Sequence, residues 1–173
     1  MLIRNFDYME KWMSITYEDI RKQRYKLDEL YSKRQRKLQD LAHKLVREYK
    51  DSLSLPSDVW TDSKGVERPY VTVGTVNDKG NYQQGSVNTA KLDEDYKINF
   101  VISTVIDDSP FDGGQHYLLS ISMSYRDGDL IVGVANEMKK IIVSSPESEL
   151  AFAQVCGVMK QVLISALTDP RLE

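Results

Sequence analysis

The chain has 173 residues, 41% of them hydrophobic and 28% charged, with a net charge of −3, a composition typical of a globular protein with an apolar core. It contains no apolar run of about 18 residues, and the charged residues Arg4, Asp7 and Glu10 interrupt its first ten positions, so we expect neither a membrane span nor a signal peptide. Cys156 is the single cysteine, which excludes an internal disulfide and a cysteine-based zinc cluster and favours a cytoplasmic protein.

Residues 16–52 are predicted to form one long amphipathic helix. Thr16 is a suitable N-cap, and neither Gly nor Pro interrupts the segment. Apolar residues recur at alternating steps of three and four, at Met13, Tyr17, Ile20, Leu27, Tyr31, Leu38, Leu41 and Leu45. This spacing is that of a coiled coil, although Arg24, Arg34 and Glu48 interrupt the seam.

The length of this helix leaves two interpretations of its apolar stripe open. About 35 residues span roughly 50 Å, whereas a compact chain of this size is only about 30 Å across. The stripe either packs on the sheet of the same chain with one end overhanging, or binds a partner helix. In the second case the oligomerisation residues are Ile20, Leu27, Tyr31, Leu38, Leu41 and Leu45. We therefore divide the chain into an N-terminal helical segment, 1–55, and an α+β domain, 56–173.

Charge is unevenly distributed along the chain. Residues 1–50 carry 13 Lys or Arg and 8 Asp or Glu, against 10 and 18 in residues 51–173. The basic run 33–37 invites a nucleic-acid interpretation. The same helix face, however, is neutralised by acidic residues placed four positions before lysines, in the pairs Glu18–Lys22, Glu29–Lys33 and Asp40–Lys44. A solvated face is therefore preferred, and nucleic-acid binding is kept as an alternative.

A series of strands follows the helix. Residues 53–69 are predicted to be a linker, with Trp60 anchoring it to the body of the domain. Alternating or apolar runs predict strands at 70–76, 82–87, 98–106, 117–125, 130–135 and 140–143. The connections are too short for parallel crossovers, so the sheet is predicted to be an antiparallel meander. Ser120, Ser122 and Ser124 alternate with apolar residues, so one face of their strand is expected to be wet or covered by polar groups.

A second helix is predicted at the C-terminal end. Ser145 and Pro146 suit its first turn, and its body, 150–167, is apolar nearly all round, so we expect burial on most sides. Cys156 lies within this body and is predicted to be an inert core thiol. The predicted fold class is therefore α+β, with a long N-terminal amphipathic helix, an antiparallel meander of five or six strands, and a buried C-terminal helix.

Motifs of known chemistry are scarce. The chain has no Gly-x-Ser-x-Gly elbow, phosphate loop or dinucleotide fingerprint, and we predict no cofactor. His116 follows Asp107, Asp108 and Asp112, a set that could hold a divalent cation. Such residues are also typical of solvated loops, and we predict no metal site there.

The triplet Glu137-Met138-Lys139 supports an enzymatic alternative. With Asp127 and Asp129, or alternatively Asp112, upstream, and with the order helix, antiparallel strands, Glu-x-Lys, helix, it resembles the PD-(D/E)xK nucleases. The resemblance implies that the carboxylates hold Mg²⁺ and that Lys139 steadies the attacking water. The rival interpretation is that the triplet is a turn.

The preferred function is a non-enzymatic one. We expect a cytoplasmic protein-binding or adaptor subunit that self-associates through its helices, such as an immunity protein, a chaperone or an accessory subunit, and that has a further protein partner. The alternatives are the metal-dependent nuclease, a nucleic-acid-binding protein that uses the basic helix, and a small-molecule binder with an apolar pocket under the meander.

Overall fold

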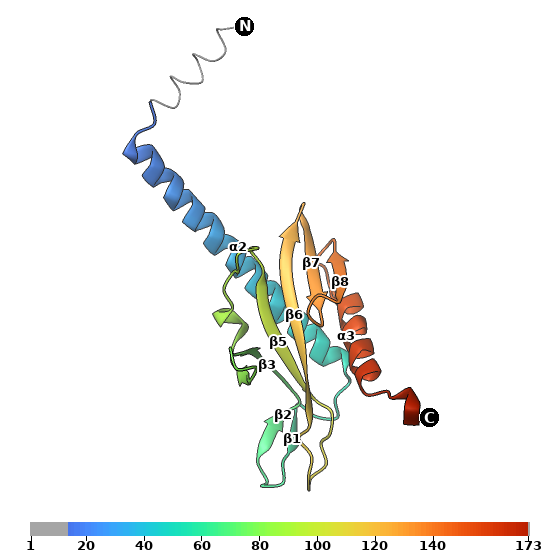
Figure 1. The fold of residues 1–173 in the computed structure, drawn as a ribbon. Helices are drawn as coiled ribbons and strands as arrows, with labels where there is room; N and C mark the ends of the chain where they lie inside the picture. The colour runs from blue at the N-terminus through green and yellow to red at the C-terminus, as the bar shows by residue number, and fades with distance from the viewer. Residues whose placement is uncertain (1–13, 173) are drawn as a thin grey trace. The chain divides into compact units, whose positions relative to one another are not determined.

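The computed structural model describes residues 14–172; Arg4, Asp7, Glu10 and Met13 lie outside this range. The elements follow in the order α2 (Tyr17–Ser52), β1 (Val59–Thr61), β2 (Glu67–Pro69), β3 (Val71–Val76), β4 (Tyr82–Gln84), η1 (Val87–Thr89), β5 (Ile98–Val105), β6 (His116–Arg126), β7 (Asp129–Val134), β8 (Lys139–Val143), α3 (Ala153–Ala166) and η2 (Pro170–Leu172) (Figure 1). The chain forms two units, one ending at Arg34 and the other beginning at Gln35. This division falls inside α2, whereas the sequence suggested one after residue 55.

The start of α2 is fixed by a reciprocal cap. The backbone N–H of Asp19 donates to Thr16 Oγ1 over 3.3 Å, while Asp19 Oδ2 accepts from the backbone N–H of Thr16 over 2.9 Å. These bonds satisfy backbone donors that the first helical turn leaves free. Hydrogen bonds to the Asp19 carboxylate from the Thr16 hydroxyl and then from the Thr16 backbone N–H lower the pKa of Asp19, so its charge is retained beside the positive end of the helix. The predicted N-cap is confirmed.

The predicted antiparallel sheet is confirmed. Strands β5 to β8 follow one another as a meander, whereas β4 lies at the edge beyond β3, so that β3 pairs with β5. Six antiparallel strands pair in the order β4-β3-β5-β6-β7-β8, with the long β5–β6 pair at the centre. The fold class is α+β, as predicted. The segment predicted as a linker instead holds the small hairpin β1–β2. Asp62 closes its turn, because Asp62 Oδ1 accepts from the backbone N–H groups of Lys64 and Val66, each over 2.9 Å. This side-chain turn is a local interaction that the residue pattern did not reveal.

One face of the six-stranded sheet forms the core of the second unit. Its buried residues include Ile98, Phe100, Ile102, Leu119, Ile121, Met123, Leu130, Val132, Val134, Ile141 and Val143. The C-terminal part of α2 covers this face, and Tyr49 Oη lies 3.0 Å from Thr104 Oγ1 within it. Helix α3 lies beside β7 and β8 (Figure 1). Both helices therefore cover the same face and leave the opposite face of the sheet without a helix.

The C-terminal helix begins later than predicted. Ser145 and Pro146 lie in a turn, and α3 starts at Ala153 with Phe152 as its N-cap residue. Leu150 has a φ of 52°, which a continuing right-handed helix does not tolerate. The turn is held from α2 instead, because Lys44 Nζ donates to the carbonyl of Pro146 over 2.8 Å. The predicted start was wrong because this tether is non-local.

Burial of α3 is confined to one stripe. Val155, Cys156, Met159 and Leu163 are buried, whereas Ile164 is 61% exposed. The prediction of burial on most sides was therefore too extensive. Burial raises the pKa of the Cys156 thiol to about 11, so the thiol stays protonated at neutral pH. None of the helices in residues 14–172 is long and apolar enough to span a membrane.

The two halves of α2 should respond differently to the same truncation. Leu45 is fully buried, whereas Leu27, on the same helix face, is 51% exposed. Leu45→Ala should lower the free energy of unfolding by about 2–5 kcal/mol, because it leaves a cavity in the core. Leu27→Ala should change it by no more than about 0.5 kcal/mol. Urea unfolding at low micromolar protein, followed by circular dichroism, measures both; equal losses would contradict this assignment of the core.

Candidate functional site

The structure divides the residues that the sequence assigned to oligomerisation. Leu38, Leu41 and Leu45 are at most 3% exposed and belong to the core of their own chain. They are therefore not available as a partner surface, and this part of the prediction is corrected. Ile20 is 61% exposed and Leu27 is 51% exposed. These two remain as candidates, because they continue the same helix face toward the N-terminus.

The exposed part of this face forms a stripe that we call the N-terminal stripe, made of Tyr17, Ile20, Leu27 and Tyr31. At about 100° per residue these side chains fall within one quarter of the helix circumference. Tyr17 and Ile20 are exposed, and Tyr31 is partly buried. Arg24 lies within the stripe, and its Nε donates to both carboxylate oxygens of Asp28 over 3.0 Å. The stripe is therefore apolar with one ion-paired interruption.

The basic run is engaged in contacts within the second unit. Lys37 Nζ lies 4.6 Å from the centre of the Tyr125 ring, a cation–π distance. Gln35 Oε1 accepts from the backbone N–H of Leu92 over 3.4 Å. Lys44, which the sequence paired with Asp40, lies 3.9 Å from Glu48 instead. Among the basic residues of the run 33–37, these contacts use Lys37.

The residues of the nuclease alternative are distributed over two turns. Glu137 lies in the β7–β8 turn, and Lys139 is the first residue of β8. Asp127 and Asp129 lie at the β6–β7 turn, at the opposite end of β7. At ~3.3 Å per residue the two ends of β7 are roughly 17 Å apart. The strand thus separates the two predicted pairs, and residues 14–172 contain no cluster of His, Cys, Asp and Glu suited to a metal ion.

The acidic loop before β6 is held by its own contacts. Tyr70 Oη donates to Asp108 over 2.6 Å, and Ser109 Oγ donates to Asp112 over 3.0 Å. His116 Nδ1 lies 3.2 Å from the carbonyl oxygen of Gly114. Asp112 and His116 thus have partners within the loop, and Asp108 has one from Tyr70, which precedes β3.

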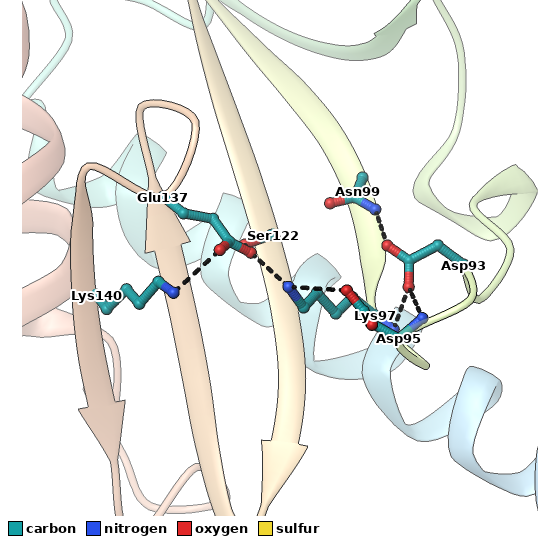
Figure 2. A network of polar contacts seen from close by, with 7 residues as sticks. All are labelled: Asp93, Asp95, Lys97, Asn99, Ser122, Glu137 and Lys140. Atoms are coloured by element: carbon teal, nitrogen blue, oxygen red, sulfur yellow. Dashed lines mark hydrogen bonds and ion pairs between the residues drawn. The ribbon is translucent and has the colours of Figure 1, made fainter.

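Glu137 is the centre of a polar cluster on the helix-free face of the sheet (Figure 2). Its Oε1 accepts from Lys97 Nζ over 2.9 Å and from Ser122 Oγ over 3.2 Å. Its Oε2 lies 3.1 Å from Lys140 Nζ. The two lysines, Lys97 first, lower the pKa of Glu137 to about 2. Three donors from separate parts of the chain thus stabilise a negative charge at one position.

The backbone that presents Glu137 adopts an unusual conformation. Ala135, Asn136 and Glu137 have φ values of 56°, 55° and 62°, a left-handed region that favours glycine. Ser120 on β6 holds this turn, because its Oγ accepts from the backbone N–H of Asn136 over 2.6 Å and donates to Asn136 Oδ1 over 2.9 Å. Such strain persists only where surrounding contacts determine the conformation, and it is common at ligand-binding positions.

Glycine is required at position 133 for the same arrangement. Gly133 pairs with Ser122 on β6 and with Lys140 on β8. A Cβ atom there would collide with Ser122 Oγ and approach Glu137 Cγ to 3.0 Å. The absence of a side chain therefore lets the Glu137 side chain lie across β7 and reach Ser122.

The carboxylate of Asp93 fixes the conformation of the segment that leads into β5. Burial opposes ionisation of Asp93, but bonds from the backbone N–H of Lys97 and from the Asn99 side chain hold its pKa below the usual value. Asn99 Nδ2 donates to Asp93 Oδ2 over 2.7 Å, and the Lys97 N–H donates to Oδ1 over 3.0 Å. Lys97 Nζ also lies 3.5 Å from Asp95. Asp93 thus fixes the segment from which Lys97 reaches Glu137.

Two hollows adjoin this cluster. The larger, about 610 Å³, is lined in part by Val76, Val101 and Leu118 together with Ser122 and Glu137. The smaller, about 370 Å³, is lined by Lys97, Lys140 and Arg126 among others, and again by Ser122 and Glu137. Glu137 therefore borders an apolar hollow on one side and a cationic hollow on the other. The small-molecule alternative placed an apolar pocket under the meander, whereas these hollows lie on the helix-free face.

Comparison of the chain with protein-family models, with curated proteins and with solved structures yields no match. Function is therefore argued from the geometry described above.

The Glu137 cluster should make stability depend on pH. The folded-state pKa of about 2 lies below the ordinary value of 4.5, so the stabilisation is fully present above about pH 4.5 and is lost as pH falls through 2. Urea unfolding between pH 3 and 7 should give wild type a higher free energy of unfolding than Glu137→Gln. This difference in free energy should be constant near neutral pH and should become smaller in acid. Glu149→Gln, which removes an exposed carboxylate, is the control and should show no such difference. A difference independent of pH would contradict the charge-based account.

Proposed function

We propose that the chain is a non-enzymatic protein-binding subunit that pairs with a second copy through the N-terminal stripe of α2. The observation that carries the proposal is the exposure of Ile20 and Leu27 on the helix face whose C-terminal continuation, at Leu38 and Leu45, is buried. Apolar side chains repeating at this spacing on a helix are favoured partners for another helix. Burying a leucine fully contributes about 1.5–3 kcal/mol, so even a short seam has a driving force.

Charge favours an antiparallel pair. In a parallel pair equivalent positions face each other, which would place Arg24 against Arg24 of the second copy within the seam. In an antiparallel pair Arg24 faces Leu27 of the second copy, and its aliphatic stem can cover that side chain. The same register places Arg21, beside the seam, near Asp28 of the second copy. The antiparallel arrangement therefore replaces a like-charge contact with an opposite-charge one.

Other properties of the chain are compatible with this role. The residues of the nuclease alternative are separated along β7, and the basic run is partly engaged by Tyr125 and Leu92. A further protein partner and a cytoplasmic location, both predicted from the sequence, are retained as parts of the proposal.

The proposal is tested by a matched pair of substitutions on one helix. Leu27 lies in the N-terminal stripe, whereas Tyr25, 64% exposed, lies outside it. Glutamine has a good helix propensity, so Leu27→Gln and Tyr25→Gln both preserve α2. Light scattering at tens of micromolar should give a dimer for wild type and for Tyr25→Gln. Leu27→Gln should weaken the dimer about tenfold or more, the equivalent of ~1.4 kcal/mol.

Two results would contradict the pairing. A wild-type molar mass of one chain across this concentration range would exclude self-association through α2. An equal loss of dimer affinity in Tyr25→Gln and Leu27→Gln would show that association does not use the N-terminal stripe. Arg21→Asp combined with Asp28→Arg provides a test of orientation, because restored pairing in the double variant is expected only for the antiparallel register.

A further inference from the structure

The cluster around Glu137 has a second property that self-association does not use. Its donors, Lys97 Nζ, Lys140 Nζ and Ser122 Oγ, all bind one carboxylate that belongs to the chain itself. Lys97 reaches it from the segment before β5, Ser122 from β6 and Lys140 from β8. Donors that converge from separate strands on one planar anion form a geometry that another carboxylate can reproduce.

We propose that Lys97, Lys140 and Ser122 form a binding site for an amphiphilic carboxylate, a small organic acid with an apolar body, which Glu137 fills when no ligand is bound. The inference is independent of the pairing through α2, because it uses the opposite side of the sheet from the buried face of that helix.

Glu137 is placed to leave the site. Its side chain is 32% exposed, so it can turn toward solvent without crossing the core. It belongs to the turn Ala135–Glu137, whose three residues have left-handed φ values. Ser120 holds this turn through Asn136, so the Glu137 side chain can leave the site while the turn is kept. An incoming carboxylate would therefore replace the Glu137 side chain while this turn stays in place.

The hollows on the two sides of Glu137 indicate the shape of the ligand. Glu137 and Ser122 line both the 610 Å³ hollow and the 370 Å³ hollow, so the Glu137 side chain lies where the two adjoin. The larger volume is within the usual range for small-molecule sites, roughly 300–1,000 Å³. Val76, Val101 and Leu118 give it an apolar wall. The body of the ligand would lie there, with its carboxylate between the two lysines.

Charge favours a single negative group over a phosphate. Each oxygen of Glu137 has one lysine, which matches the two oxygens of a carboxylate. Asp95 lies 3.5 Å from Lys97 Nζ and would repel a second negative charge at that end of the site. A dianion would therefore gain less than a monoanion of the same size.

Hexanoate is a suitable probe, with hexanol and acetate as controls that lack the carboxylate and the body respectively. In titration calorimetry, Glu137→Ala should bind hexanoate at least tenfold more tightly than wild type, because the internal competitor is gone. Adding Lys140→Gln should abolish this gain. Adding Lys139→Gln should not, since Lys139 neighbours Lys140 on β8 but alternates to the other face of the sheet. Circular dichroism checks the fold of each variant.

Wild-type protein supplies a readout that needs no substitution. In two-dimensional NMR, millimolar hexanoate should shift the amide signals of Lys97, Ser122 and Glu137, and hexanol should not. The proposal is overturned if hexanoate leaves these signals in place, if hexanol binds Glu137→Ala as tightly as hexanoate does, or if Lys139→Gln costs as much affinity as Lys140→Gln.

Discussion

Burial of one stripe of α2 against one face of the sheet is the interaction on which the second unit depends. Leu38, Leu41, Leu45 and Tyr49 supply large apolar surfaces that are at most 3% exposed. Tyr49 adds a hydrogen bond to Thr104, so its hydroxyl is not left without a partner in the core. Because α3 covers the same face, the main apolar layer of the strands lies on that side. The other side carries the serines of β6 beside a smaller apolar group that includes Val76, Val101 and Leu118.

This one-sided covering explains where the polar cluster forms. A carboxylate flanked by two lysines would be costly within the apolar layer under α2. On the helix-free face it retains access to solvent while Ser122 and Lys97 define its geometry. The strained turn at Ala135–Glu137 lies on the same face. It is held there by Ser120, which bonds to both the backbone and the side chain of Asn136. The cluster thus joins β5, β6 and β8 on the side that the helices leave open.

Features set by local spacing could be predicted from the sequence, and features set by pairing could not. The cap at Thr16, the strand runs and the polar alternation of β6 follow from short-range patterns. The turn before α3 is contacted by Lys44, about a hundred residues earlier, which donates to the carbonyl of Pro146. Lys97 is equally invisible in a local pattern, because its meeting with Glu137 requires the registers of β5–β6 and β6–β7 together. Lys140 lies only three residues after Glu137, whereas Lys97 and Ser122 come from distant parts of the sequence.

The two ends of α2 show why one sequence pattern supported two interpretations. A heptad repeat indicates that one helix face is apolar, but it does not indicate which surface covers that face. At Leu38, Leu41 and Leu45 that surface is the chain's own sheet, while Ile20 and Leu27 carry the same face into the other unit, where both are exposed. Arg24 and Arg34 interrupt this N-terminal part, and Arg24 is ion-paired with Asp28 of the same helix. Charged residues within a seam are more easily accommodated between two helices, where their long stems can lie along the partner and their charged ends reach solvent. The composition of the N-terminal stripe is therefore better suited to a helix pair than to a core.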